Sequence, residues 1–253
     1  MANLKEFLTQ FGFEPRINNP ILYRLKGNNV FSRLFFGTSR MIGRLPFEMF
    51  KNKFYPEINS RIIELPFLFT HIPTDKKLKI LDFGCNESSI PIQLANIGHK
   101  VVGYDLLPYP YKHSNFTFHE GNFLDNKMSS ESFDVVLGIS SVEHCGLGSY
   151  DSPLFSEGDI KIMKELHRVL KKGGMLILTV PFGQKHKDEF QHIYDSKALK
   201  DLIKGFTVKE ERYFIRNKAL TEWTESTKEK TEKVPYVDQK RGADGLVCLI
   251  CTK

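Results

Sequence analysis

The sequence lacks any apolar run that approaches the roughly 18 residues needed for a membrane-spanning helix. Its first residues, MANLKEFLTQFGF, include a glutamate and a glutamine where a secretory signal peptide has a continuous apolar stretch. Internal repeats and low-complexity tracts are absent too. With 253 residues, 41% of them apolar and 26% charged, the chain has the composition of a globular protein with one large domain, alone or with an appendage. These features predict a cytoplasmic protein.

Cysteine is also scarce, with four residues in all: Cys85, Cys145, Cys248 and Cys251. The spacing Cys248-x-x-Cys251 occurs in redox and zinc sites, but here it lies in the apolar run GLVCLICT, which reads as a strand. Residues three apart in a strand point to opposite faces, so these two thiols cannot share a ligand. No second pair is present to complete a zinc site. We therefore expect buried, reduced cysteines and no metal site.

Acidic residues are nearly absent between residues 16 and 53, where eight lysines and arginines stand against Glu48 alone. Eight minus one gives +7, compared with +6 for the whole chain. This asymmetry predicts an anionic partner near the N-terminal segment. Phenylalanines alternate with the arginines, a pattern compatible with nucleic acid, an anionic membrane surface or a phosphorylated glycan. In the alternative interpretation, the phenylalanines pack on a neighbouring domain and the arginines remain in water.

The chain changes character near residue 76. Residues 1–75 are aromatic-rich, basic and interrupted by prolines, which predicts an N-terminal helical cap of short helices. Residues 76–253 alternate strands with helices. The expected strands are KLKILDFG, KVVGYDL, FTFHEGNF, FDVVLGIS, MLILTVPFG, TVKEERYFI and GLVCLICTK, and the expected helices are IPIQLANIG, SEGDIKIMKELHRVLKKGG and DSKALKDLIKGF.

This alternation predicts an α/β fold: a Rossmann-like, doubly wound and mostly parallel seven-stranded sheet. The last two strands have no helix between them, so they are expected to form a terminal antiparallel hairpin. A polar insertion at about 216–245 separates these two strands, and its lone Trp223 is expected either to line a lid or to anchor the loop.

The loop KILDFGCNESSI follows the first of these strands, where the ligand of an open parallel sheet lies. Gly84 permits a tight turn. Asn86 replaces a second glycine, and asparagine enters the left-handed backbone region more readily than most residues. Ser88 or Ser89 is expected to cap the next helix. A working ligand-binding turn is therefore expected, built from altered residues.

Two acids indicate the kind of ligand. Glu87 would repel a phosphate at the helix N-terminus, and the loop lacks the lysine of a P-loop. We therefore expect a ligand without phosphate there, such as a cofactor with a cationic centre. Asp105 ends the second strand, where an acid accepts hydrogen bonds from ribose hydroxyls.

Five blocks in this order resemble a class I S-adenosylmethionine-dependent methyltransferase: LDFGCNESS, VVGYDLLPYP, FHEGNFLD, SFDVVLGISSVEHCGLG and ELHRVLKKGGMLILTVPFG. The resemblance covers roughly residues 78–215, and is strongest to the bacterial and archaeal branch whose members often act in glycan or small-molecule biosynthesis. It implies S-adenosylmethionine as the cofactor. By resemblance, ten residues line the cofactor: Asp82, Gly84, Cys85, Asn86, Asp105, Leu106, Asn122, Phe123, Ile139 and Ser140.

The resemblance also implies individual roles. Asp82 and Gly84 would shape the methionine end of the pocket, Asp105 would bind the ribose and Leu106 would pack on the adenine. Asn122 stands where the family commonly has an aspartate that accepts from the adenine amino group, and an amide oxygen can accept the same bond. Ile139 and Ser140 would lie near the transferred methyl group.

The block SSVEHCGLGSYD carries the candidates for catalysis. Transfer to a hydroxyl requires a base, and the ordinary pKa of histidine suits His144 to that task at neutral pH. Glu143 would assist or orient it. The alternative is that His144 only packs or caps the loop. Further on, His186, Asp188, Glu189 and His192 have no compact metal-ligand spacing and are expected in a solvated loop that reaches the acceptor, with Tyr194 beside substrate or cofactor.

The leading hypothesis is methyl transfer to an oxygen of a small molecule or glycan. Two alternatives remain: a nucleic-acid methyltransferase that uses the basic N-terminal segment, and a cofactor-binding pseudoenzyme. A nicotinamide dehydrogenase is disfavoured by Glu87 and by the terminal hairpin. The sequence does not indicate the oligomeric state.

Overall fold

The computed structural model describes residues 13–14, 24–25, 58–86, 88–148, 154–238 and 242–253. The chain divides into two units, Met1–Pro56 and Glu57–Lys253. In the first unit, the described residues form two short antiparallel strands, β1 (Phe13–Glu14) and β2 (Arg24–Leu25). Most of the basic segment, and therefore most of the expected helical cap, lies outside the described residues.

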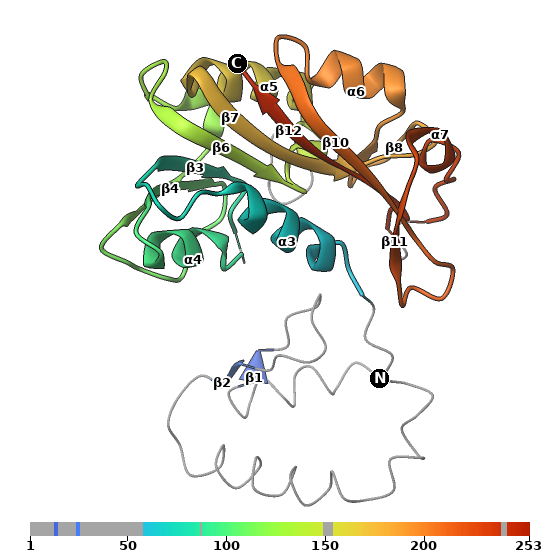
Figure 1. The fold of residues 1–253 in the computed structure, drawn as a ribbon, viewed down its shortest axis with the longest axis horizontal. Coiled ribbons are helices and arrows are strands. Elements are labelled where there is room, and N and C mark those ends of the chain that lie inside the picture. The colour runs from blue at the N-terminus through green and yellow to red at the C-terminus, as the bar shows by residue number, and fades with distance from the viewer. Residues whose placement is uncertain (1–12, 15–23, 26–57, 87, 149–153, 239–241) are drawn as a thin grey trace, which may run out of the picture. The chain divides into compact units, whose positions relative to one another are not determined.

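An eight-stranded sheet forms the centre of the second unit (Figure 1). Its strands, in spatial order, are β11 (Trp223–Ser226), β10 (Thr207–Arg216), β12 (Gly245–Thr252), β7 (Leu170–Pro181), β6 (Phe133–Ile139), β3 (Lys79–Phe83), β4 (Lys100–Asp105) and β5 (Phe116–Glu120). The strands from β7 to β5 are parallel, whereas β12 pairs antiparallel with both β7 and β10. This confirms the predicted Rossmann-like, mostly parallel sheet with a terminal antiparallel hairpin.

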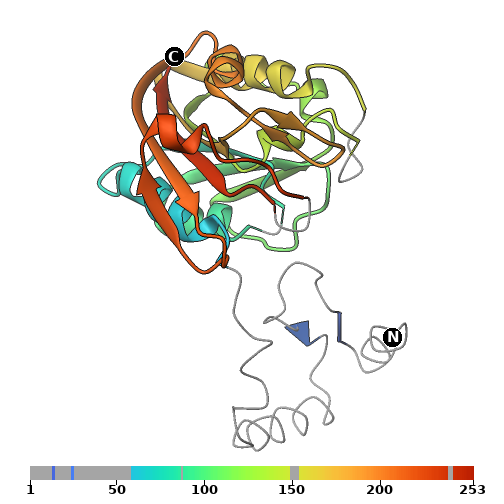
Figure 2. The same cartoon turned by 90° about the vertical axis from the view of Figure 1, so that its right-hand side faces the viewer.

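All seven predicted strands are present, and β11 is an eighth that the sequence did not predict. It lies within the expected polar insertion and pairs with β10, from Tyr213 opposite Ser226 to Arg216 opposite Trp223. An edge strand needs no continuous apolar face, so its polar sequence carries little strand signal. The Trp223 indole Nε1 donates to the Ile58 carbonyl oxygen at 2.9 Å and so joins β11 to the chain before α3. The hairpin of β10 and β11 lies beside this part of the chain (Figures 1 and 2). A short helix, α7 (Lys228–Thr231), follows.

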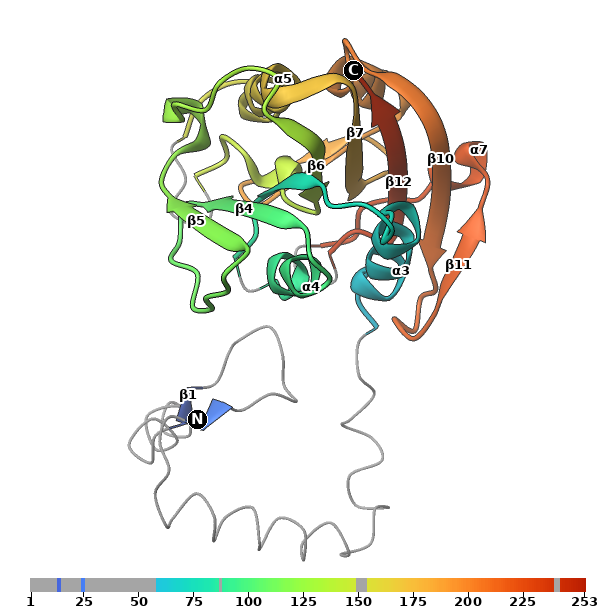
Figure 3. The same ribbon diagram turned by 60° about the vertical axis from the view of Figure 1, so that its left-hand side comes forward.

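Helices cover both faces of the sheet, as in a doubly wound fold (Figures 1 and 3). On one face, α5 (Gly158–Val169) and α6 (Ser196–Leu202) bury apolar side chains such as Leu166 and Leu199. On the other face, α3 (Arg61–His71) and α4 (Ile90–Asn96) form a second core. The helix predicted over residues 156–174 ends at Val169, and the residues after it extend β7.

Helix α3 corrects the predicted domain boundary. The sequence placed residues 61–71 in an N-terminal cap that ended at residue 75. Instead, Phe67 and Leu68 are buried against Ile80 and Leu94 of the sheet unit, so the division falls between Pro56 and Glu57. The prolines suggested broken helices, but packing on the sheet keeps α3 continuous through Pro66.

The four cysteines are free thiols, and Cys85, Cys248 and Cys251 are buried, whereas Cys145 is half-buried. In β12, Cys248 faces the core beneath α3 and α4, and Cys251 faces the core beneath α5 and α6. The two thiols therefore point to opposite faces of the sheet, as predicted.

The remaining elements are short: η2 (Phe123–Asp125), η3 (Val142–His144), β8 (His186–Lys187) and β9 (His192–Ile193). In the part of the chain that the structure describes, none of the helices has the length and apolarity that a membrane span requires.

Candidate functional site

The candidate site lies where the carboxyl ends of β3, β4 and β6 meet. β3 stands between β4 and β6, and the strand order reverses at this point. In an open parallel sheet, such a switch point leaves a crevice between the loops that follow the strands. The loop after β3, the end of β4 and the segment after β6 all reach this place.

Gly84 makes the turn after β3 with φ +71°, in the left-handed region. A Cβ atom here would lie 2.4 Å from the Cβ of Ser141, which is closer than real side chains approach. Ser140 and Ser141, the two residues directly after β6, are called the Ser140–Ser141 corner below. Ser141 Oγ donates to the Phe83 carbonyl oxygen at 3.1 Å, so the corner packs directly against the loop after β3.

The other expectations for this loop are only partly met. Asn86 does not have positive φ, so the prediction that it holds a left-handed position is wrong, and Gly84 alone supplies that conformation among the described residues of the loop. Ser88 Oγ accepts from Ile90 N at 3.1 Å, at the start of α4, whereas Ser89 makes no side-chain capping bond to the backbone. Glu87 lies outside the described residues.

Asp105 connects the ends of β3 and β4. Its Oδ2 accepts from Asn86 N at 2.8 Å, and its Oδ1 accepts from Leu107 N at 2.9 Å. Burial raises the pKa of this carboxyl, and the backbone N–H donors oppose that rise. Each oxygen retains a further lone pair, so the carboxylate can still accept two hydrogen bonds from a ligand.

Asp82, near the end of β3, is a second acid at this edge. It is 2% exposed, and its Oδ2 has no hydrogen-bond partner among the described residues. Burial raises the pKa of Asp82 to about 7, while Arg61 acts in the opposite direction. Buried polar atoms nearly always have a hydrogen-bond partner, so an unpartnered oxygen needs an explanation. A ligand with a hydrogen-bond donor could supply the missing partner. Burial also raises the pKa of the neighbouring Cys85 thiol, which is therefore not a nucleophile at neutral pH.

The residues expected around the adenine occupy different environments. Leu106 is half-buried, and Asn122 Oδ1 accepts from Leu124 N at 3.1 Å, which caps η2. Phe123 is buried in the core, with its ring 5.1 Å from that of Phe83. Ile139, which was expected near the transferred methyl group and not at the adenine, is also buried. Any contact of Phe123 with a ligand would therefore come from its backbone.

Tyr109 was not singled out from the sequence. Its hydroxyl donates to the Ser88 carbonyl oxygen at 2.6 Å, and its ring lies 5.1 Å from that of Phe116. Tyr109 thereby joins the segment after β4 to the loop after β3, and its place in the block VVGYDLLPYP was the available signal.

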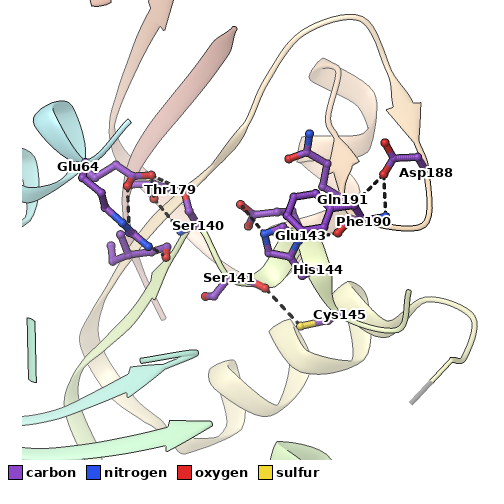
Figure 4. Close-up of polar contacts among 12 residues, drawn as sticks. Glu64, Ser140, Ser141, Glu143, His144, Cys145, Thr179, Asp188, Phe190 and Gln191 are labelled. Carbon is purple, nitrogen blue, oxygen red and sulfur yellow. Dashed lines mark hydrogen bonds and ion pairs between the residues drawn. The ribbon is translucent and has the colours of Figure 1, made fainter. Parts of the chain in front are cut away.

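Glu143 and His144 form η3, which begins directly after the Ser140–Ser141 corner (Figure 4). The His144 Nδ1 and the Phe190 carbonyl oxygen are 2.6 Å apart, so Nδ1 carries the proton in the neutral ring. His144 Nε2 lies 3.9 Å from Glu143 Oε1. Burial lowers the pKa of His144, whereas the bond to the Phe190 carbonyl raises it. The imidazole is therefore neutral at pH 7.

Glu143 itself is 2% exposed, and its Oε2 has no hydrogen-bond partner among the described residues. Burial raises the pKa of Glu143 to about 8; Glu64 raises this pKa further, and Arg61 lowers it. The carboxyl is therefore protonated at neutral pH in the ligand-free protein. The structure thus places Glu143 and His144, the two predicted catalytic residues, together in η3 after the Ser140–Ser141 corner.

A polar network from α3 reaches the other side of the corner, and the sequence did not reveal it (Figure 4). Glu64 Oε1 accepts from the hydroxyls of Ser140 and Thr179, and Glu64 Oε2 lies 3.0 Å from Arg61 Nη1. Arg61 Nη1 also donates to the Ile139 carbonyl oxygen at 3.3 Å. The i, i+3 spacing of Arg61 and Glu64 within an apolar helix was the only local signal.

The loop after β7 closes the far side of the site. Asp188 Oδ1 accepts from Phe190 N at 2.8 Å, which orders the loop around the carbonyl that binds His144. Tyr194 is buried, and its hydroxyl donates to Asp159 Oδ2 at 2.9 Å, so this hydroxyl binds the protein. Glu189 is exposed. Within the described ranges, no group of three or more His, Cys, Asp or Glu side chains is arranged to hold a metal ion.

Comparison with known proteins adds sequence similarity to this geometry. A demethylmenaquinone methyltransferase of Chlorobaculum parvum is 34% identical over 113 residues, which are 42% of this chain and 42% of the relative. Ribosomal RNA large subunit methyltransferase E of a Wolbachia species (subsp. Brugia malayi) is 26% identical over 141 residues, 53% of this chain and 62% of the relative. The chain thus spans less than two thirds of the length of either curated relative.

Solved structures show the same fold. A crystal structure of an S-adenosylmethionine-dependent methyltransferase from Methanosarcina mazei aligns with a TM-score of 0.51 at 18% identity, over 74% of this chain and 97% of the other. A methyltransferase of the same type from Mesorhizobium loti aligns with a TM-score of 0.50 at 14% identity, over 75% and 97%. The predicted resemblance to class I methyltransferases is therefore confirmed in fold and in sequence similarity.

One protein family, described as "Caenorhabditis protein of unknown function, DUF268", matches residues 112–239, just over half of the 253 residues. This range includes η2, β6, η3, α5 and β7, and so both predicted catalytic residues. The chain belongs to this family, and its fold is that of class I S-adenosylmethionine-dependent methyltransferases.

Proposed function

We propose that this protein is a methyltransferase that binds S-adenosylmethionine at the ends of β3 and β4 and methylates an oxygen atom of a small molecule or glycan. The observation that carries the proposal is the position of the His144 imidazole beside the Ser140–Ser141 corner, with its Nδ1 held by the Phe190 carbonyl at 2.6 Å. Burial lowers the pKa of this imidazole. A hydroxyl must lose its proton as it is methylated, and a neutral imidazole can accept that proton at pH 7.

The groups at the switch point fit the proposed cofactor. S-adenosylmethionine has a ribose diol, a cationic amino group and a sulfonium centre that supplies the methyl group. The Asp105 carboxylate retains two lone pairs suited to the diol. The unpartnered Asp82 Oδ2 suits a cationic donor, which would also lower the pKa of this carboxyl from about 7.

The residues of the chain would divide the remaining tasks by position. Gly84 lets the loop after β3 approach the ligand closely. The Ser140–Ser141 corner separates this loop from η3, so that His144 serves the acceptor and not the cofactor. Glu143, protonated and unpartnered at Oε2, is suited to donate a hydrogen bond to an acceptor oxygen.

The charge at the described site favours a neutral or cationic acceptor. Asp82, Glu64 and Glu143 are buried acids near Arg61, and Arg61 is itself paired with Glu64. A polyanion would meet little positive charge here. The sequence-based expectation of an anionic partner, which could be the acceptor, came from residues 16–53, which lie almost entirely outside the described part of the chain.

The names of the two curated relatives give different acceptors, demethylmenaquinone and ribosomal RNA. A screen with S-adenosylmethionine labelled in its methyl group should therefore present hydroxylated small molecules, glycans, quinones and RNA in parallel. The proposal predicts label on an oxygen of a small molecule or glycan, with S-adenosylhomocysteine as the second product. Label on RNA would favour the nucleic-acid alternative. Binding of S-adenosylhomocysteine without transfer to any of these classes would favour a pseudoenzyme.

A further inference from the structure

Glu64 is completely buried, with 0% of its surface exposed, although it carries a carboxylate. Charged side chains are buried only where they are paired and hydrogen-bonded. Glu64 meets that condition through groups at the proposed site. Its partners are the Ser140 hydroxyl, the Thr179 hydroxyl at 2.9 Å and Arg61 at 3.0 Å.

The residue that Glu64 binds has an unusual backbone. Ser140 has φ +43°, in the left-handed region that serine seldom adopts. Its N–H donates to both the carbonyl and the Oγ1 of Thr179 at 3.0 Å, and its hydroxyl donates to Glu64. A strained backbone persists only where the surrounding contacts over-determine it. Glu64 and Thr179 together supply those contacts.

The conformation of Ser140 affects both halves of the site. Ser141 occupies the space in which a Cβ of Gly84 would lie, and it binds the Phe83 carbonyl. The η3 turn with Glu143 and His144 starts at the next residue. A rotation at Ser140 would therefore move the support of the loop after β3 and the origin of η3 together. Figure 4 shows this order, from Glu64 through Ser140 and Ser141 to His144.

We propose that Glu64 is a positioning residue, which holds Ser140 in its left-handed conformation and thereby sets the cofactor loop and His144 relative to each other. The inference rests on the proposed function, because it assigns Glu64 a role at that site. In this proposal, a residue of α3 affects the reaction only through Ser140 and contacts neither substrate nor cofactor.

Four variants of the full chain separate positioning from general stability. Glu64→Leu removes the carboxylate at similar size, whereas Glu64→Gln retains an oxygen that can accept from both hydroxyls. Thr179→Val removes the hydroxyl that accepts from Ser140 N and donates to Glu64, while the Thr179 carbonyl still accepts from Ser140 N. It keeps Glu64, so it tests the proposal even if Glu64→Leu does not fold. Leu68→Val is the matched control, because Leu68 lies on the same helix but packs in the core.

Two measurements are made on each variant. Backbone chemical shifts of ligand-free protein report the conformation of Ser140 and the environment of Gly84. Calorimetry with S-adenosylhomocysteine as the probe reports the loop after β3. We expect Glu64→Leu and Thr179→Val to move the Ser140 shifts out of the left-handed range, to shift Gly84, and to weaken binding at least tenfold. Glu64→Gln should stay within about threefold of the parent protein, and Leu68→Val should change neither quantity.

Unchanged Ser140 shifts in both Glu64→Leu and Thr179→Val would overturn the proposal. So would a moved Ser140 with Gly84 and the binding constant unaffected, because the corner would then not be coupled to the loop. If the parent protein does not bind S-adenosylhomocysteine, the proposed function fails, but the Ser140 and Gly84 shifts still decide whether Glu64 positions the corner.

Discussion

Asp105 ends β4 with each carboxylate oxygen already accepting one backbone N–H, from Asn86 at 2.8 Å and from Leu107 at 2.9 Å. One lone pair per oxygen remains for the two ribose hydroxyls of the proposed cofactor. Asp105→Ala removes both acceptors. Asparagine would not be a conservative replacement, because its NH₂ group would face one of the two backbone donors.

The magnitude follows from these contacts. A hydrogen bond to a charged group contributes about 1.5–3 kcal/mol. Each Asp105 oxygen also accepts from a backbone N–H, and water can enter the space that the alanine leaves. Both effects reduce the binding free energy that the substitution removes. We expect a total of about 1.4–2.8 kcal/mol, which is a roughly ten- to hundredfold weaker affinity for S-adenosylhomocysteine.

Isothermal titration of the parent protein and of Asp105→Ala with S-adenosylhomocysteine measures this loss. Asp105→Ala also leaves Asn86 N without its acceptor, so a control must remove a comparable bond elsewhere. Asp134→Ala does so, because Asp134 Oδ2 accepts from Lys79 N at 2.8 Å at the opposite, amino-terminal end of β3. The control should bind like the parent protein. A dissociation constant for folded Asp105→Ala within twofold of the parent value would refute the placement of the ribose.

Three further predictions concern Gly84, Glu143 and His144. Gly84→Ala should abolish S-adenosylhomocysteine binding and lower the melting temperature more than Gly173→Ala. Gly173 has a similar φ of +69°, but no atom lies within 4 Å of the position that its Cβ would take. An equal drop in melting temperature in the two variants would show that only backbone strain matters. Burial raises the pKa of Glu143 from an ordinary 4.5 to about 8 in the folded state, so between these pH values the folded state holds a proton that the unfolded state has lost. The stability of the parent protein should therefore fall relative to that of Glu143→Gln as the pH rises from about 4.5 to about 8. Melting temperatures of the two proteins that change in parallel from pH 5 to 8 would contradict this. His144→Ala should reduce turnover of the acceptor found in the screen by about a hundredfold or more while affinity for S-adenosylhomocysteine stays within a fewfold. Because the pKa of His144 is lowered, the parent rate should rise with pH through an apparent pKa below 6.5, and normal turnover without His144 would remove it from the mechanism.

The centre of the sheet was predictable because β3, β6, β7 and β12 are rich in buried apolar residues. Turns with glycine and amphipathic helices separate most of the strands. Gly84 and Asp105 were predictable for the same reason, since the end of a strand places them at the switch point. β11 was not, because an edge strand paired on one side needs no apolar periodicity.

The missed residues depend on contacts between distant parts of the chain. Glu64 meets Thr179 across 115 positions, and local sequence gives no sign of that pairing. Asn86 was expected in the left-handed region on propensity alone. Instead, the left-handed turn is made two residues earlier, at Gly84, and Asn86 donates its N–H to Asp105. Ser140, which does have positive φ, is held there by tertiary hydrogen bonds.

A crystal structure of the full chain with S-adenosylhomocysteine would test the proposed cofactor site. We expect the ribose hydroxyls on the Asp105 carboxylate, the amino group near Asp82, and the sulfur facing the Ser140–Ser141 corner with His144 beyond it. A chain that crystallises without the ligand at saturating concentration, or that binds it away from the ends of β3 and β4, would show that the cofactor site is not where we propose.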